Sequence, residues 1–190
     1  MGASLESALS NETNIIAKWL DQLRRPSPTA FVGQTEGHAL ESRVFDALAR
    51  AKILTSQVAM HLEQEFRDNL FRQFDSLHET DEWEEDDEPL DQSSFQTFLK
   101  VILTIKPERH PGLGLANTGN LIAAWTTGRD RLTIEFLPDD QVRWVLSRYY
   151  DDEPVRIAGQ MGVSRLVEEL TPYQPDRWFC RESKGDISSR

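Results

Sequence analysis

The hydrophobic pattern of the chain changes its period near residue 120, from that of a helix to that of a strand, and returns to helical spacing at residue 163. Between residues 40 and 77, eleven apolar positions follow one another in steps of three or four, so that ten steps cover 37 residues, a mean of 3.7. This period is typical of an amphipathic α-helix. From residue 121 onward apolar and polar residues alternate, as in a strand with one packed face.

The first period predicts one long helical segment over residues 38–78, because residues 38–88 contain neither glycine nor proline. A continuous helix over the stripe would be about 55 Å long, more than a body of this size covers alone. The helix either breaks near Thr55 and Ser56 into two packed helices, or buries its stripe against another chain. We favour the second alternative slightly, which makes the expected oligomerisation residues Leu40, Val44, Leu48, Leu54, Val58, Leu62 and Phe66.

An amphipathic helix is also predicted before this segment, over residues 12–24. Its apolar stripe consists of Ile15, Ile16, Trp19, Leu20 and Leu23. The prolines at positions 26 and 28 end it, because the residue before a proline is disfavoured in the α region. Residues 25–37 then have the composition of a linker.

Two shorter helices are expected further along the chain. Ser93 and Gln96 have the spacing of a capping box, and the apolar residues from Phe95 to Leu103 follow helical spacing until Pro107. The second helix covers Val163 to Leu170 and ends before a proline. Residues 107–117, rich in glycine and proline, are expected to form a loop.

The alternating segments predict an antiparallel meander of three to four strands. The three clear segments are residues 121–125, 132–136 and 142–146, and residues 155–159 could add a fourth. Turn residues separate them at hairpin lengths. The expected fold class is therefore α+β, with N-terminal helices, the meander and a C-terminal helix. The expected organisation is an N-terminal helix and linker (1–37), the long helical segment (38–78), an acidic loop with the α+β domain (79–182) and a disordered tail (183–190).

Charge is concentrated in one place. The chain has a net charge of −11, and residues 79–91 contain nine acidic and no basic residues. The other 177 positions carry 23 acidic and 21 basic residues, a net charge of −2. This balance argues against direct binding to nucleic acid, which depends on Lys and Arg, and against attraction to anionic membranes.

The single cysteine and the apolar runs limit the expected environment. Cys180 has no partner for an internal disulfide, and Cys-rich zinc sites are excluded. The first nine residues lack the features of a secretory signal, and no apolar run reaches the roughly 18 residues of a membrane span. We expect a cytoplasmic protein.

The residues that carry chemistry form no recognisable catalytic set. None of the four histidines has the spacing of a helical metal site. Gly112 and Gly114 precede a predicted strand and not the helix that a phosphate-binding loop requires. We therefore expect no catalytic residue, metal or cofactor. The alternative is a metal-dependent hydrolase or nuclease that uses carboxylates of the acidic segment.

Trp83 lies inside the acidic run, which is an unusual place for a large apolar side chain. Either its ring packs back between the long helix and the Phe95 helix, or it anchors a partner within an electrostatic steering patch. Both hold if the ring is structural and the acids bind. The expected partner-binding residues are Asp81, Glu82, Trp83, Glu84, Glu85, Asp86, Asp87 and Glu88.

The stretch from Phe74 to Phe179 resembles a loosely defined group of small, uncharacterised bacterial α+β proteins. The resemblance is carried by the acidic Trp83 segment, Pro107 and Pro111, and by the motifs GNL at 119–121, LTIEF at 132–136 and VRW at 142–144. It implies a subunit of a toxin–antitoxin or phage-defence module and assigns no catalytic residue.

We therefore expect a non-enzymatic subunit that docks on, or neutralises, a basic partner protein. The partner is expected to be encoded nearby, and the long helix to mediate a homo- or hetero-oligomer. A third alternative is an acidic mimic of nucleic acid, which would need carboxylates spaced like phosphates.

Overall fold

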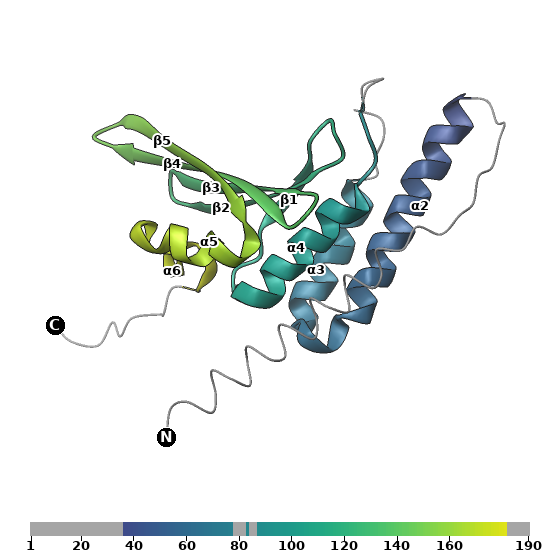
Figure 1. Cartoon of the computed structure of the whole chain (residues 1–190), viewed down its shortest axis with the longest axis horizontal. Helices are drawn as coiled ribbons and strands as arrows, with labels where there is room; N and C mark the ends of the chain where they lie inside the picture. The colour runs from purple at the N-terminus through teal and green to yellow at the C-terminus, as the bar shows by residue number, and fades with distance from the viewer. Residues whose placement is uncertain (1–35, 78–82, 84–86, 182–190) are drawn as a thin grey trace.

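A layer of helices covers one face of an antiparallel sheet in the computed structural model of the chain (Figure 1). The structure describes residues 36–77, 83 and 87–181. The expected helix over residues 12–24 and the expected tail over 183–190 lie outside these residues. The helical elements are α2 (Glu36–Gln57), η1 (Ala59–His61), α3 (Gln64–Ser76), α4 (Gln92–Ile105), α5 (Val163–Leu170), η3 (Thr171–Tyr173) and α6 (Asp176–Phe179).

The sheet is a meander of five strands in sequence order, each antiparallel to its neighbours. The α+β class is confirmed, and the expected count of three to four strands is too low. The strands are β1 (Gly112–Leu115), β2 (Leu121–Thr127), β3 (Asp130–Leu137), β4 (Gln141–Tyr150) and β5 (Glu153–Gly162).

The additional strand is β1, which lies in the segment expected to be a loop. Its two glycines weaken a strand signal because glycine has no side chain to pack. Pairing with the edge of β2 overrides this weak local preference, with Leu113 opposite Ala123 and Leu115 opposite Leu121. Leu113 and Leu115 pack against the main core.

The expectation of one long helix is wrong. The chain leaves the helical conformation after Gln57, passes through η1 and an extended stretch at Leu62 and Glu63, and begins α3 at Gln64. Neither glycine nor proline causes the break. The alternative of a break near Thr55 and Ser56 into two helices is the one found. Both residues are still in the last turn of α2, where each hydroxyl donates to the carbonyl four residues earlier at 2.8 Å.

The apolar stripe that we assigned to an oligomer interface is packed within the chain itself. The chain reverses direction at η1, so both halves of the stripe pack into one core. A straight helix of this length could not do so. Four of its members are buried, namely Val44, Leu54, Val58 and Phe66, while Leu48 and Leu62 are partly buried against the core and Leu40 is partly buried. The stripe therefore supplies no reason for a second chain, and assembly stays a prediction.

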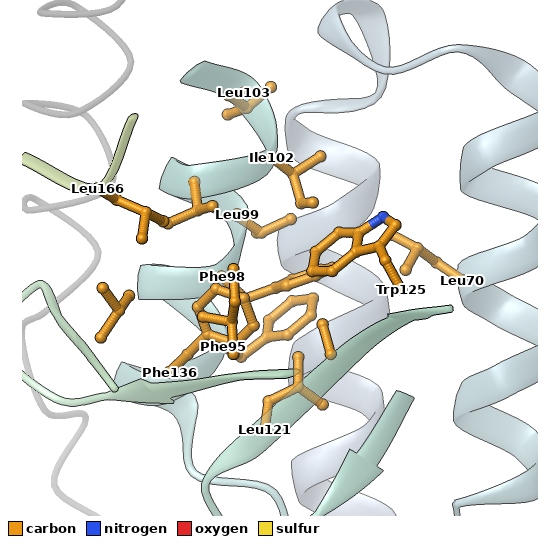
Figure 2. Packing of buried hydrophobic residues seen from close by; sticks show 14 of the residues in the cluster. Leu70, Phe95, Phe98, Leu99, Ile102, Leu103, Leu121, Trp125, Phe136 and Leu166 are labelled. Atoms are coloured by element: carbon orange, nitrogen blue, oxygen red, sulfur yellow. The ribbon is translucent and has the colours of Figure 1, made fainter. Parts of the chain in front are cut away.

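Helix α4 occupies the centre of the core, between the sheet and the pair α2 and α3 (Figure 1). Nine of its fourteen residues are buried, because the helix is covered from two sides. Phe95 and Phe98 point into the space between β-strand residues and α3, as Figure 2 shows with Phe136, Leu121 and Leu70.

Hydroxyl groups at the start of α4 fasten the helix to the sheet. Ser94 Oγ donates to the carbonyl of Phe136 at 2.6 Å and accepts the amide of Leu121 at 2.8 Å. Thr97 Oγ1 donates to the carbonyl of Leu137 at 2.8 Å. These bonds satisfy backbone groups where the pairing of β2 with β3 ends, so the position of α4 along the sheet is specified by polar contacts as well as by packing.

A buried carboxylate at the other end of the sheet holds the C-terminal helices. Asp130 is 8% exposed, its Oδ2 lies 2.7 Å from Arg177 Nη2, and its Oδ1 accepts the amide of Tyr149 at 3.0 Å. Arg109 donates to the carbonyls of Arg177 at 2.8 Å and Thr126 at 2.6 Å. Together these contacts tie α6 to the β2–β3 hairpin.

We predict that Asp130→Asn lowers the free energy of unfolding by about 2–3 kcal/mol, less than the cost of breaking a fully buried pair because Arg177 is 36% exposed. The asparagine can still accept the Tyr149 amide through Oδ1, so the loss reports the whole ion pair with Arg177, both its charge and its hydrogen bond. Equilibrium denaturation in urea measures it.

The matched control is Asp152→Asn, whose partner Arg129 lies with it at the surface, with 62% and 87% of the two side chains exposed. That substitution should change the free energy by no more than about 0.5 kcal/mol. Equal effects of the two substitutions would contradict the role given to Asp130.

Candidate protein-binding surface

The acidic segment connects the end of α3 to the start of α4. Of the expected partner-binding residues, the structure describes Trp83, Asp87 and Glu88. The other expected residues, Asp81, Glu82, Glu84, Glu85 and Asp86, lie outside the described part of the chain. What the structure supplies is therefore the two ends of the segment, at α3 and at α4.

The C-terminal end of the segment is fixed to the β1–β2 turn by two backbone hydrogen bonds. The Glu88 amide donates to the Asn117 carbonyl and the Asp91 amide to the Gly119 carbonyl, each at 2.9 Å. Asp91 then caps α4 by accepting the Ser94 amide at 2.7 Å. A capping carboxylate at this position is favoured by the free amides and the dipole of the helix.

Gly119 makes this contact sterically feasible. A Cβ atom on Gly119 would lie 2.3 Å from the Pro89 carbonyl oxygen, and the residue has a φ of +77°, a backbone conformation that suits glycine. The turn and the acidic segment therefore approach each other more closely than any other residue type would permit.

Trp83 lines a shallow hollow on one side of the segment. The hollow has a volume of about 240 Å³ and is lined by Trp83, Asp87, Glu88 and residues at the end of α3 and of β1. Trp83 is partly buried, which is compatible with a ring that packs on the body and with one that also contacts a partner, so both alternatives stay predictions.

A second hollow, of about 370 Å³, lies on the other side of Glu88, between α2 and the start of α4. Its charged lining is mixed, with Arg43, Asp46 and Arg50 from α2 opposite Glu88 and Asp91. Arg43 forms an ion pair with Glu88. Glu88 thus lines both hollows, and its ion pair with Arg43 partly neutralises its charge.

The carboxylates of the acidic run therefore fall into two groups. Glu88 and Asp91 serve internal contacts, so a basic partner would meet chiefly the carboxylates before them. Arg43, Asn117 and Gly119 help to shape this surface, although they were not predicted to do so. The glycine in the turn TGN at 118–120 was the one available signal, and nothing in the sequence indicates that Arg43 faces Glu88.

The described residues form no group of potential metal ligands. Among residues 36–77, 83 and 87–181, no three or more His, Cys, Asp or Glu side chains are grouped so that they could hold a metal ion. The alternative of a metal-dependent hydrolase therefore finds no supporting geometry in this part of the chain. None of the described helices has both the length and the apolar character required to cross a membrane.

Cys180 lies at the C-terminal end of α6, where its environment disfavours the thiolate. Burial raises the pKa of its thiol, and the negative charges of Asp176 and Glu108 raise it further. The thiol group lies 3.9 Å from Asp176 Oδ1. This is the reverse of the electropositive setting that activates a catalytic cysteine.

Comparison with family models, with curated proteins and with solved structures finds no match to this chain. The resemblance to a group of small bacterial proteins consequently stays a prediction, and functional inference rests on the surface itself.

We predict that Gly119→Ala destabilises the protein more than Gly128→Ala does. Both glycines have a positive φ, but a Cβ on Gly128 meets nothing within 4 Å. Gly128→Ala should therefore cost only the backbone strain, about 1–2 kcal/mol. Gly119→Ala should cost roughly 1–3 kcal/mol more, as overpacking does. Urea denaturation measures both, and equal costs would show that the segment does not press against the turn.

We also predict that alkylation of Cys180 by iodoacetamide has its pH midpoint above that of N-acetylcysteine amide, a reference thiol without a neighbouring carboxylate. A raised pKa leaves less thiolate at any given pH, so the rate profile moves to higher pH. Asp176→Asn removes one source of the shift and should return the midpoint part of the way. A midpoint below that of the reference thiol would instead indicate an activated nucleophile and favour an enzyme.

Proposed function

We propose that this protein is a non-enzymatic subunit that binds a basic partner protein through its acidic segment. The observation that supports the proposal most is the anchoring of Glu88 and Asp91 to the β1–β2 turn. It holds the base of a run of nine carboxylates at one place on a folded body. A charge cluster presented in this way can meet a complementary surface repeatedly in one orientation.

Charge and shape support different parts of the interaction. A dense cluster of one sign raises the association rate with an oppositely charged partner and makes that rate depend on salt. Trp83 adds a partly buried aromatic ring beside a hollow, and tryptophan is over-represented among residues that dominate binding energy. The acids would thus steer the partner and the ring would hold it.

The biological role in this proposal is that of an antitoxin or of a subunit in an anti-phage defence module. A nuclease toxin has a basic groove for nucleic acid, which is the natural complement of a carboxylate run. The resemblance noted in the sequence favours the same role. Assembly through the stripe from Leu40 to Phe66 is not part of the proposal, because the chain buries most of those side chains itself.

Neutralising the segment should weaken partner binding by at least about tenfold and flatten its salt dependence. The test variant carries Glu84→Gln, Glu85→Gln, Asp86→Asn and Asp87→Asn. Affinity purification from the source cells, with the wild-type chain as bait and identification by mass spectrometry, first defines the partner. Titration of the purified partner at low and high salt then measures the dissociation constant.

The control variant removes the same number of negative charges from exposed residues elsewhere, namely Asp151, Glu153, Glu168 and Glu169. It should bind the partner as the wild type does. Equal loss in both variants would mean that only net charge matters, and unchanged affinity in the test variant would remove the acidic segment from the interaction.

A further inference from the structure

Strand β5 lies at an edge of the sheet (Figure 1). It has ten residues and pairs with β4 on one side. The opposite edge strand, β1, has four residues. There the side chain of Gln73 covers the backbone, since it accepts the amide of Leu113 at 2.7 Å and donates to the carbonyl of Pro111 at 3.0 Å. The short edge is therefore protected, while the long edge has no such cover within the described part of the chain.

The ladder between β4 and β5 decides which backbone groups of β5 point outward. The amide of Val163 donates to the carbonyl of Asp140 at 2.9 Å. In an antiparallel pair, hydrogen-bonded positions of this kind alternate with non-bonded ones. The continuous register therefore leaves the odd-numbered residues of β5 bonded to β4. The amides and carbonyls of Arg156, Ala158 and Gln160 point away from the sheet.

These outward groups form a free strand edge. Arg156, Ala158 and Gln160 are exposed, and none of the described residues forms a hydrogen bond with their backbone. An unpaired edge is a template for another strand, which proteins generally block with proline, charge or a bulge. In β5 such devices are confined to the first part of the strand, namely Pro154 and Arg156. The part that follows is open to pairing.

We propose that β5 pairs antiparallel with β5 of a second copy of this chain, about a two-fold axis at Ala158, so that the two sheets become continuous. Arg156 of each copy then lies opposite Gln160 of the other. Three residues in each strand, with one donor and one acceptor each, supply about six hydrogen bonds across the axis. Because both copies use the same edge, the assembly closes at two chains.

The chemistry of the strand selects this register. Pro154 has no N–H group, and it lies opposite Gly162, which as the N-cap of α5 commits its carbonyl to that helix. The two groups unable to bond thus face each other. An axis nearer the start of the strand would place Pro154 opposite Gln160 or Ala158 and leave a free carbonyl without a donor. An axis at Arg156 would also bring two like charges together, and one nearer Gly162 would shorten the ladder.

Apolar side chains on the helix-covered face of β5 gain contacts in the same register. Val155 lies opposite Met161 of the other copy, and Ile157 lies opposite Gly159. Val155 is 41% exposed in the single chain, and Ile157 and Met161 are partly buried. Cross-strand apolar neighbours stabilise a sheet. The pairing therefore buries apolar surface as well as backbone.

A strand of a basic partner protein fits this edge less well than a second copy does, because Arg156 lies on it and Arg143 of β4 lies opposite Gln160. Pairing through β5 leaves both acidic segments free, since Glu88 and Asp91 are anchored at the β1–β2 turn, on the far side of the sheet. The dimer would therefore present two acidic segments, which increases avidity for a partner with repeated sites.

Sedimentation analysis of the full-length chain tests the pairing. A strand-edge contact belongs to the small, weak class of interfaces, so the series runs from about 5 to 500 µM. The wild type should change from monomer to dimer. Ala158→Lys places two ammonium groups together at the axis and should raise the dissociation constant at least about threefold. The matched control Ala124→Lys adds the same charge to the same sheet face on β2 and should dimerise as the wild type does.

Disulfide cross-linking reports the register. In a Cys180→Ser background, Ala158→Cys places two thiols at a hydrogen-bonded pair whose Cα atoms are about 5.5 Å apart, a separation that a disulfide spans. Mild oxidation should link this variant at least about tenfold faster than Ala124→Cys in the same background, because only the first pair is held at a high effective concentration.

Three results would overturn the proposal. The first is a chain that stays monomeric up to about 500 µM. The second is a dimer that Ala158→Lys forms as readily as the wild type, because the contact then lies elsewhere, for example at the exposed Phe45 and Ile53 of α2. The third is equal cross-linking of the two cysteine variants. Circular dichroism and tryptophan fluorescence of each variant verify that the sheet is folded.

Discussion

A row of aromatic rings holds the three layers of this protein together. Phe74 of α3 contacts Phe95 of α4 with ring centroids 5.3 Å apart, Phe95 stacks on Phe98 at 5.7 Å, and Phe98 meets Phe136 of β3 at 5.2 Å. Edge-to-face and offset contacts of this kind add to the hydrophobic stabilisation of each ring. Because the row passes through α4, neither α3 nor the sheet can move without disturbing that helix.

This constraint also determines where the charged part of the molecule emerges. The acidic segment joins α3 to α4, so both of its ends are set by helices that the row of rings fixes. Asp91 caps the helix that carries Phe95, and its amide bonds Gly119 in the β1–β2 turn. The last carboxylates of the acidic run, Glu88 and Asp91, are therefore held at one place on a body that is otherwise nearly neutral.

Much of this architecture could be predicted from the sequence, because period and turn residues are local signals. The helix Val163–Leu170 has the predicted bounds, and the alternating segments are the strands β2, β3 and β4. The break after Gln57 was one of two alternatives and the less favoured one, because neither glycine nor proline marks it and the burial of both halves in one core is a tertiary effect. Strand β1 was missed because its two glycines weaken the local strand signal, and the strand forms through its pairing with β2. The partners Arg43 and Glu88 are 45 residues apart, and no local pattern relates such positions.

The central claim is that helices and sheet form one cooperative unit through α4. Equilibrium denaturation in urea, followed at once by far-ultraviolet circular dichroism and by tryptophan fluorescence, tests it most directly. The first signal is dominated by helices, and the second includes Trp125 and Trp144, which are buried in the sheet. The account predicts coincident transitions with one midpoint, as for a two-state domain. Loss of the helical signal at a lower urea concentration than the tryptophan signal would contradict it.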